Sequence, residues 1–407
     1  MQKQSQLFGK TNKEFKQFES LNATLLQKAG FIHQEMAGVY SFLPLGKLVL
    51  DKIEVIVKEE MSKISNEINM PSLSSKESWE ITGRLNTIDV LMKGLGANKA
   101  SSDKNNAEYI LNPTHEEIIT PIAKKYNMSY KDFPFALFQI QTKFRNEARP
   151  KSGLLRGREF RMKDLYSFHT SMEDLKEYYE IVKESYFTIF ERLGLKEYTV
   201  LVRSSGGDFT TDYSEEFQIL CKNGEDTIYH DKENDIYYNK EIADKSIMKN
   251  GKLASEAGNI FILKDKFSKD FDYTVQLQNN TQSPIYMGCY GMGTSRIMGI
   301  IAENFNDENG LIWPESVSPY DYHLISQSKE FEKDIKKIIE KIQSKNKTVL
   351  WDDRENVSMG EKFTDSDLIG IPTRIVISKR SLESGGVEIK ERKNKDSSIV
   401  KIDNLNI

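Results

Sequence analysis

The feature that most constrains this chain is a basic stretch, residues 143–169, with two extended segments on either side of a turn. Residues 150–153 of this stretch read Pro-Lys-Ser-Gly. Because Pro and Gly this close together mark a turn, the stretch is predicted to form an antiparallel β-hairpin with a long loop.

This predicted hairpin is also strongly charged. From Lys143 to Lys163 there are eight Lys/Arg and two Glu, a local net of +6, whereas the whole chain carries −4. Residues two apart in a strand share a face, so Arg145, Glu147 and Arg149 are expected to point the same way. Guanidinium groups bind phosphate bidentately, and the charge therefore favours a bound anion. The alternative is a solvated hairpin that binds nothing.

A glycine-rich stretch, residues 287–303, predicts a second anion site. Gly288, Gly291 and Gly293 precede an apolar segment with Arg296 in its first turn. A helix N-terminus attracts phosphate through its free N–H groups and its dipole. The glycine order is not that of a dinucleotide fingerprint, and no Gly-Lys-Ser/Thr follows. A strand-to-helix turn without a ligand is the alternative.

The segment Asn112-Pro-Thr-His-Glu-Glu117 carries a helix-start pattern. Thr114 is a good N-cap, and Glu117 stands at the capping-box position. On this interpretation the segment is purely structural.

Bulk properties bound the class of protein. A chain of 407 residues with 38% hydrophobic residues is long enough for about two to three domains. Two cysteines, Cys221 and Cys289, cannot build a disulfide framework or a Cys-rich zinc site. No apolar run approaches the ~18 residues of a membrane span. Without a leader-like N-terminus, a cytoplasmic protein with no membrane partner is expected.

Periodicity predicts the remaining elements. Residues 12–60 are expected to be largely helical, including a helix over 47–64, and residues 76–107 to form a surface loop around short helices. Further predicted elements are a helix over 171–194 and strands over 197–202 and 215–221. After the linker Trp313–Pro319, strands over 322–326, 348–351 and 373–377 alternate with helices over 331–342 and 359–369. That alternation is typical of a small α/β domain.

Residues 143–169 resemble motif 2 of the class II aminoacyl-tRNA synthetases, and within them that of the prolyl-tRNA synthetase family. Residues 47–75 resemble motif 1 and residues 287–303 motif 3, and the resemblance runs from about residue 5 to about 395. It implies an α+β fold: a class II antiparallel sheet flanked by helices over 1–313, then an α/β anticodon-binding domain over 314–407. Motif 1 implies a homodimer.

The resemblance also implies an activity, the ligation of L-proline to tRNA(Pro) through prolyl-adenylate, with ATP and Mg²⁺ and no metal held by the protein alone. It assigns roles residue by residue. Catalysis falls to Arg145, Glu147 and Arg296, and ATP binding to these three with Arg156, Arg158 and Phe160. Proline binding falls to Thr114, Glu116, Phe168, His169, Asn259 and Cys289, and tRNA binding to Arg149, Arg354, Lys362 and Phe363.

The chain departs from the family pattern at three places. Glu215 stands where His is usual, and Asn259 also replaces a His. The short polar segment 230–255 occupies the place of a large editing domain, so we expect no editing in cis and a separate deacylase for Ala-tRNA. A threonyl-type synthetase, which needs a zinc site, and a non-catalytic tRNA- or DNA-binding paralogue remain the alternatives.

Overall fold

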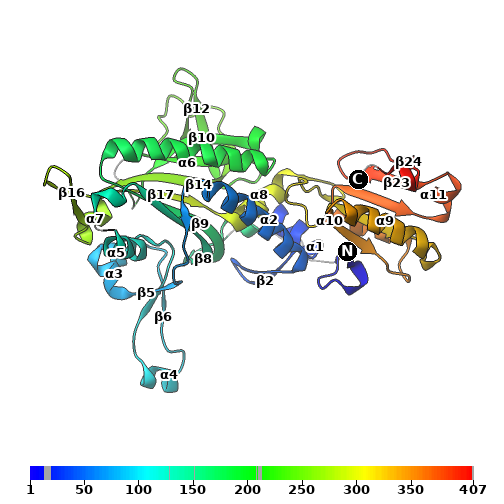
Figure 1. Ribbon diagram of the computed structural model, residues 1–407, viewed down its shortest axis with the longest axis horizontal. Coiled ribbons are helices and arrows are strands. Elements are labelled where there is room, and N and C mark those ends of the chain that lie inside the picture. Colours follow the sequence, from blue (N-terminus) through cyan, green and yellow to red (C-terminus); the bar gives the residue numbers. More distant parts are fainter. Residues whose placement is uncertain (13–19, 128, 151, 208, 210–212, 406–407) are drawn as a thin grey trace. The chain divides into compact units, whose positions relative to one another are not determined.

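The computed structural model in Figure 1 describes residues 1–12, 20–127, 129–150, 152–207, 209 and 213–405. They form two compact units: a larger one, residues 36–39 and 54–300, and a smaller one, residues 1–35, 40–53 and 301–407. Helices α1 (Leu21–Lys28) and α2 (Pro44–Met61) fall in the segment expected to be helical. That prediction is wrong between them, where β2 (Ile32–Met36) and β3 (Val39–Phe42) pair in a two-stranded sheet, and residues 13–19 lie outside the described part. No described helix is long and apolar enough to cross a membrane.

The larger unit is built on a nine-stranded, mostly antiparallel sheet. In spatial order the strands are β11 (Tyr213–Leu220), β10 (Thr199–Ser205), β13 (Ile236–Asn239), β12 (Asp226–Asp231), β14 (Lys252–Lys264), β17 (Tyr286–Met292), β9 (Glu159–His169), β8 (Phe135–Phe144) and β4 (Asn66–Glu67). Strands β8 and β9 pair antiparallel from Phe135↔Phe168 to Phe144↔Glu159. The predicted hairpin is therefore confirmed.

Helix α6 (Met172–Arg192) covers one face of this sheet (Figure 1) and packs on β9, β14 and β17. Ser171 caps it by accepting a hydrogen bond from Asp174 N at 3.2 Å. Its buried side chains recur at helical spacing: Leu175, Tyr179, Val182, Tyr186, Ile189 and Phe190. The helix predicted over 171–194 is confirmed. Its apolar stripe faces the sheet, as expected for an amphipathic helix that packs on a core.

The predicted shared face of Arg145, Glu147 and Arg149 is wrong. Strand β8 ends at Phe144, and beyond it Glu147 N donates to Arg145 O at 2.8 Å. This tight turn breaks the strand alternation. The loop is anchored instead by the 3₁₀ turn Gly153–Leu155, whose two leucines are buried; Lys151 lies outside the described residues.

Residues 76–107 were predicted to form a surface loop around short helices, and for the first part of this segment the prediction of a surface location is wrong. The segment contains α3 (Lys76–Ile81), the 3₁₀ turn η2 (Arg84–Asn86), β6 (Met92–Gly94) and the exposed α4 (Lys99–Lys104). Strand β6 joins β7 (Tyr109–Leu111) and β5 (Leu73–Ser75) in a three-stranded sheet. Trp79 and Arg84 are buried, so this segment belongs partly to the core.

The predicted N-cap at Thr114 is also wrong. Helix α5 (Glu116–Tyr126) is preceded by His115 as its N-cap, without a capping hydrogen bond from that side chain. The Thr114 hydroxyl donates instead to Glu116 Oε2 at 2.6 Å. Thr114 is not the cap because the helix begins one residue later than predicted, with His115 at the N-cap position.

The smaller unit contains a six-stranded sheet. Its order is β1 (Gln2–Lys3), β21 (Val349–Asp352), β20 (Tyr322–Ser326), β22 (Thr373–Ile377), β23 (Val387–Glu391) and β24 (Ser398–Val400). With α9 (Glu332–Ser344) and α10 (Met359–Ile369), the predicted strand–helix alternation is confirmed. Strand β1 was not predicted: it pairs in parallel with β21, Gln2 opposite Leu350.

Candidate active site

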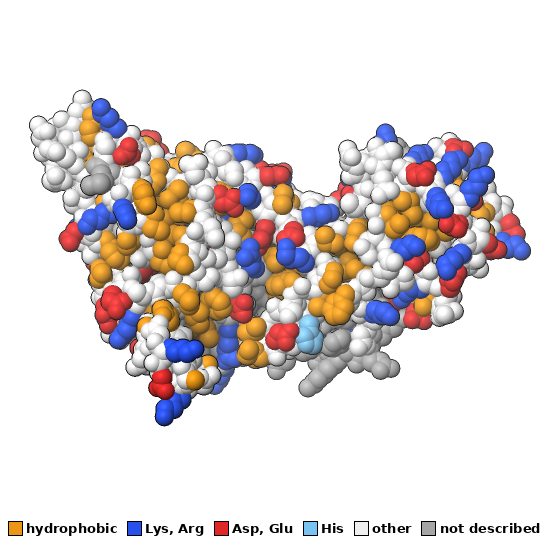
Figure 2. Space-filling model, turned by 60° about the horizontal axis from the view of Figure 1, so that its bottom comes forward, with side chains coloured by type: hydrophobic (Ala, Val, Ile, Leu, Met, Phe, Trp, Pro, Cys, Tyr) orange, Lys and Arg blue, Asp and Glu red, His pale blue; other side chains and the backbone are white. Residues whose placement is uncertain are grey.

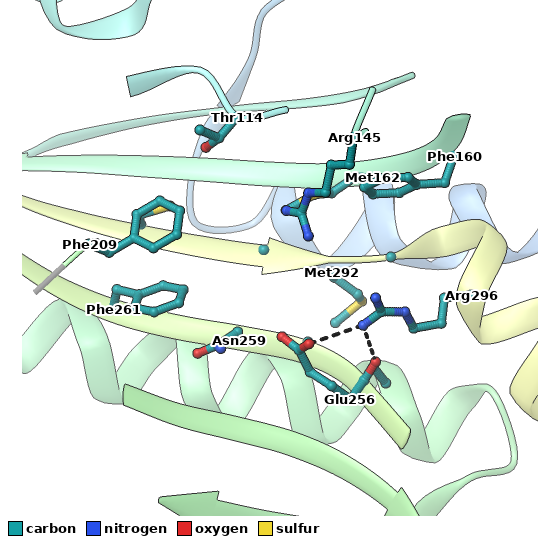
Figure 3. Close-up of a pocket in the computed structure, with 15 residues that line it drawn as sticks. Thr114, Arg145, Phe160, Met162, Phe209, Glu256, Asn259, Phe261, Met292 and Arg296 are labelled. Carbon is teal, nitrogen blue, oxygen red and sulfur yellow. Dashed lines mark hydrogen bonds and ion pairs between the residues drawn. The ribbon is translucent and has the colours of Figure 1, made fainter. Parts of the chain in front are cut away.

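A cleft of about 210 Å³ opens on the large sheet, away from α6 (Figure 3). Strands β9, β14 and β17 form it, together with the start of α8 (Thr294–Asn304) and the segment before α5. Its lining residues are Thr114, Arg145, Phe160, Met162, Phe209, Glu256, Ala257, Gly258, Asn259, Phe261, Cys289, Gly291, Met292, Gly293 and Arg296. A Cβ on Gly291 would lie 2.6 Å from Met162 Cε, so a larger residue there would displace the end of that side chain.

Two arginines from distant segments converge on this cleft (Figure 3). Arg296 Nη1 donates to Glu256 O at 2.7 Å and to its Oε2 at 3.1 Å. Burial opposes the charge of Arg296, but Glu256 and Glu225 raise its pKa. For the Arg145 guanidinium no hydrogen bond or ion pair occurs within the described residues. Burial and then the Arg296 charge lower the pKa of Arg145. Two converging cations with one carboxylate partner make a site for an anion.

A smaller hollow continues from the same two arginines. It is lined by Arg145, Glu147, Leu154, Leu155, Arg156, Gly157, Phe160 and Arg296. Glu147 forms an ion pair with Arg156 at 2.8 Å, and the Arg145 guanidinium lies 5.2 Å from the centroid of the Phe160 ring. Five of the six residues assigned to ATP therefore meet here.

Arg158 and Arg149 lie differently. Arg158 Nε donates to Glu147 O at 2.9 Å, and its backbone N donates to Gly38 O at 2.7 Å. Arg158 thus ties down the loop and lines neither hollow within the described residues. Arg149 is exposed.

At the other end of the cleft, Thr114, Asn259 and Cys289 line the wall, and Glu116 lies fully buried behind them. Glu116 Oε2 accepts from Thr114 Oγ1 at 2.6 Å, and Oε1 accepts from Cys289 Sγ at 3.2 Å. Burial raises the pKa of the Cys289 thiol, and the Glu116 charge raises it further, so the thiol stays protonated. Asn259 Oδ1 is buried and has no partner in the described structure.

Two residues assigned to proline lie elsewhere. Phe168 is buried in the core, stacked on Phe135 with ring centroids 4.7 Å apart. His169 is also buried, and its Nδ1 lies 2.8 Å from Asp174 Oδ2. Burial lowers the pKa of His169 against the opposing effect of Asp174. Neither side chain is among the described residues that line the cleft.

Sequence reasoning missed several lining side chains, among them Glu256, Phe209 and Phe261. Phe261 lies two residues from Asn259 on β14, so strand alternation was a usable signal. Glu256 falls out of that alternation because the pairing of β11 with β14 shifts between Phe217↔Gly258 and Gln218↔Glu256, a β-bulge that redirects side chains. Phe209 packs on Phe261 with ring centroids 4.7 Å apart, and no local pattern announces it.

The cations predicted to bind tRNA in the smaller unit are held by internal partners. Lys362 is buried and donates to Ser326 O at 2.7 Å. Arg354 forms two hydrogen bonds with Asp352, at 2.9 and 2.7 Å. Phe363 is half-buried, and the Arg374 guanidinium lies 4.7 Å from its ring centroid. On the face in Figure 2, basic and acidic side chains are interspersed over this unit.

Comparison with known proteins places this geometry in a family. Residues 99–305 match the tRNA synthetase class II core domain (G, H, P, S and T), and residues 321–406 match an anticodon binding domain. The proline–tRNA ligase of Ehrlichia ruminantium is 36% identical, covering 92% of this chain and 91% of that protein. That of Agrobacterium fabrum is 34% identical, covering 95% of each. The chain belongs to the proline–tRNA ligase family.

The fold agrees with this membership. The Giardia lamblia prolyl-tRNA synthetase in complex with prolyl-adenylate superimposes with a TM-score of 0.79 at 21% identity, covering 94% of this chain and 75% of that one. The chain is therefore an α+β protein with a class II synthetase core and an anticodon-binding domain, as the sequence predicted. Like other members of the proline–tRNA ligase family, it is an enzyme of the aminoacyl-tRNA ligase class.

Proposed function

We propose that this chain ligates L-proline to tRNA(Pro) in two steps, with ATP as the energy source. A proline carboxylate oxygen attacks the α-phosphorus of ATP, which forms prolyl-adenylate and releases pyrophosphate. The terminal ribose hydroxyl of the tRNA then attacks the prolyl carbonyl carbon and AMP leaves. The observation that carries the proposal is the convergence of Arg145 and Arg296 on one cleft with Thr114 and Cys289 at its far end.

Neither step needs a protein nucleophile, so the chain acts by positioning and by neutralising charge. Arg145 binds the α-phosphate and the proline carboxylate between the two ends of the cleft. Arg296 and Arg156 bind the outer phosphates. Phe160 stacks on the adenine ring, and Glu147 accepts a hydrogen bond from its amino group. Stacking at Phe160 places the base on the wall that Arg145 already faces.

The far end of the cleft suits a small cyclic imino acid. Phe209 and Phe261 supply apolar walls for the ring, while Thr114 and Asn259 supply polar groups for the nitrogen. Glu116 lies directly behind Thr114 and provides the negative charge that a buried secondary ammonium group requires. Phe168 and His169 act from the core, by holding β9 in place.

Whether the cleft can hold Mg²⁺ depends on the oxygen ligands that line it. Glu256 is the one carboxylate among the described residues that line the cleft. Mg²⁺ usually binds through one or two carboxylates together with substrate phosphates and water, so this single carboxylate fits. Glu256 would hold the ion, which when bound adds positive charge beside the phosphates. Arg296 remains the protein's own cation there.

The remaining partners complete the proposal. Arg149, exposed beside the motif 2 loop, contacts the tRNA acceptor stem, and the smaller unit binds the anticodon near Arg354, Lys362 and Phe363. Helix α2 and the strand after it form the dimer interface. A role in protein synthesis sets the protein in the cytoplasm.

We further propose that the chain does not edit in cis. The segment between β11 and β14 folds as the β12–β13 hairpin, which buries too little to form a hydrolytic domain. A pocket sized for proline rejects alanine only by a few methylenes, each worth about 1–3 kcal/mol, so we infer that alanine is misactivated and that a separate deacylase clears Ala-tRNA(Pro). Hydrolysis of preformed Ala-tRNA(Pro) by the purified protein would exclude this.

Proline-dependent ATP–pyrophosphate exchange tests the function. Exchange with proline is expected, and it separates this reading from its rivals. Exchange with threonine in place of proline would indicate a threonyl-type enzyme. If no amino acid supports exchange while tRNA still binds, the chain is a non-catalytic paralogue.

A further inference from the structure

Behind the imino-acid end of the cleft lies a buried group of charges that the proposed chemistry does not use. Arg84, on η2, is 2% exposed. Its Nη1 donates to Glu116 Oε2 at 3.1 Å and to Glu117 Oε1 at 2.9 Å. Glu116 and Glu117 are both buried. One guanidinium therefore serves two adjacent carboxylates, only one of which touches Thr114 and Cys289 of the cleft wall.

Arg84 is shut off from the cleft by aromatic rings. Its guanidinium lies 4.9 Å from the ring centroid of Phe209, 5.1 Å from that of Phe267 and 5.6 Å from that of Trp79. Arg84 Nε and Nη2 are buried and unpartnered within the described structure. A cation enclosed in this way cannot contact substrate, but it acts on the cleft through Glu116 and through Phe209.

The charge balance of the three groups depends on one proton. With Glu117 ionised, two carboxylates face one guanidinium and a single negative charge is left over. With Glu117 protonated, Arg84 cancels the charge of Glu116 and nothing is left for a buried cationic substrate, which needs a compensating charge.

We propose that Arg84 and Glu117 are positioning residues for substrate binding: Glu117 compensates Arg84, and Glu116 thereby keeps one uncompensated negative charge for the secondary ammonium group of the imino acid. This inference rests on the proposed function. Thr82 takes part as well, because its Oγ1 donates to Glu117 Oε1 at 2.9 Å and so favours the ionised form.

The proton balance sets a pH dependence. Burial raises the pKa of Glu117 to about 7, against the effect of Arg84, whereas Arg84, Thr114 and Cys289 together lower the pKa of Glu116 despite its burial. Above about pH 7 Glu117 is ionised and Glu116 is available. Below about pH 7 Glu117 is protonated, and the charge of Arg84 then neutralises that of Glu116. Proline should therefore bind more tightly as the pH rises through about 7, with a plateau above.

Other groups face this cluster or titrate in the same range. From α7 (Lys266–Asp270), Asp270 senses the charges of Lys266 and Arg84. His115, the residue before Glu116, has its pKa lowered to about 4 by burial and the Lys143 charge, so it is neutral near pH 7. Burial lowers the pKa of Lys163 to about 7 and raises that of Glu216 to about 7. Because several groups titrate near pH 7, only variants of Glu117 and its partners can show that Glu117 causes the pH dependence of KM.

The test is proline-dependent ATP–pyrophosphate exchange from pH 6 to 9, with the full chain. For the native protein, KM for proline should fall as the pH rises through about 7. Glu117→Gln should raise KM for proline roughly 10-fold at pH 8, the effect of losing one buried charge partner, and should flatten the profile. KM for ATP and kcat should change less than about 2-fold if the effect is confined to the imino-acid end.

Thr82→Val provides a second variant that keeps both carboxylates. Loss of its hydrogen bond should move the midpoint of the KM profile to higher pH, and Asp103→Asn, the control at an exposed site on α4, should leave the midpoint unchanged. A native profile in both Glu117→Gln and Thr82→Val would overturn the inference. So would a parallel loss of kcat and melting temperature with the shape of the profile retained, because that marks a structural role only. Absence of proline-dependent exchange in the native protein would instead overturn the proposed function.

Discussion

The cations of the two units differ in what they contact. In the larger unit, Arg145 faces Arg296 across the cleft, and burial together with the Arg296 charge lowers its pKa. In the smaller unit, Arg354 is paired with Asp352 and Asp365, at 2.7 and 2.9 Å, and these partners raise its pKa. Arg145 lies beside a second cation and has no ion-pair partner within the described residues, although Arg296 itself pairs with Glu256 at 3.1 Å. Arg354, in contrast, is neutralised by two carboxylates.

This difference shows why a count of Lys and Arg does not locate an anion site. A cation that two carboxylates already neutralise, as Asp352 and Asp365 neutralise Arg354, gains little from a phosphate, because these partners must first be displaced. A cation held beside another cation gains most, since the anion removes the repulsion. Arg145, beside Arg296 and without a carboxylate partner in the described structure, is therefore better evidence for ligand binding than the paired Arg354.

The largest expected effect is on the chemistry at the cleft. Arg296→Ala should lower the rate of proline-dependent ATP–pyrophosphate exchange by about 10²–10³-fold, the usual cost of removing one preorganised donor to a transition state. Arg380→Ala, at an exposed arginine of the smaller unit, is the control and should exchange at the native rate. Equal rates for the two variants would remove the distinction between the two regions.

The next effect is on stability in the smaller unit. Lys362→Met should lower the free energy of unfolding by about 2 kcal/mol, because it leaves buried acceptors, among them Ser326 O, without their donor. Denaturant unfolding measures this, with Lys333→Met at an exposed position of α9 as the matched control. If Lys362→Met is as stable as the control and instead only weakens tRNA binding, Lys362 is an RNA contact and not a structural cation.

The smallest effect is on acid stability. Arg392 Nη1 and Nη2 lie 2.7 and 2.5 Å from the carboxylate oxygens of Asp307, and these hydrogen bonds lower the pKa of Asp307 to about 2. Its stabilisation is therefore complete above about pH 4 and is lost as the pH falls toward 2. Asp307→Asn should flatten the dependence of melting temperature on pH in that window, while Asp396→Asn, at an exposed site, should retain it.

Local signals in the sequence predicted much of the fold. The β8–β9 hairpin followed from its Pro/Gly turn, and α6 and the strands and helices of the smaller unit followed from their periodicity. Strand β1 did not, because two residues, Gln2 and Lys3, have no periodicity and their partner Leu350 is distant in the chain. Pairing between remote segments is set by the whole fold.

That Arg145 and Arg296 line one cleft agrees with the anion sites expected from their sequence patterns, while their roles came from the family resemblance and stay predictions. The candidate site was not predictable where backbone geometry decides orientation. The bulge on β14 turns Glu256 into the cleft, and the turn after Phe144 removes Arg149 from the face it was expected to share. Arg84 was missed because a polar, glycine-containing segment gives no sign that one of its cations is buried.

The most direct test of the account is the melting temperature of Arg145→Met with and without ATP. Because Arg145 and Arg296 repel in the free protein, the variant should melt at the native temperature or above it when ATP is absent. ATP should raise the melting temperature of the native protein and leave that of the variant unchanged. A variant that melts lower without ATP, yet is stabilised by ATP as much as the native protein, would contradict the account.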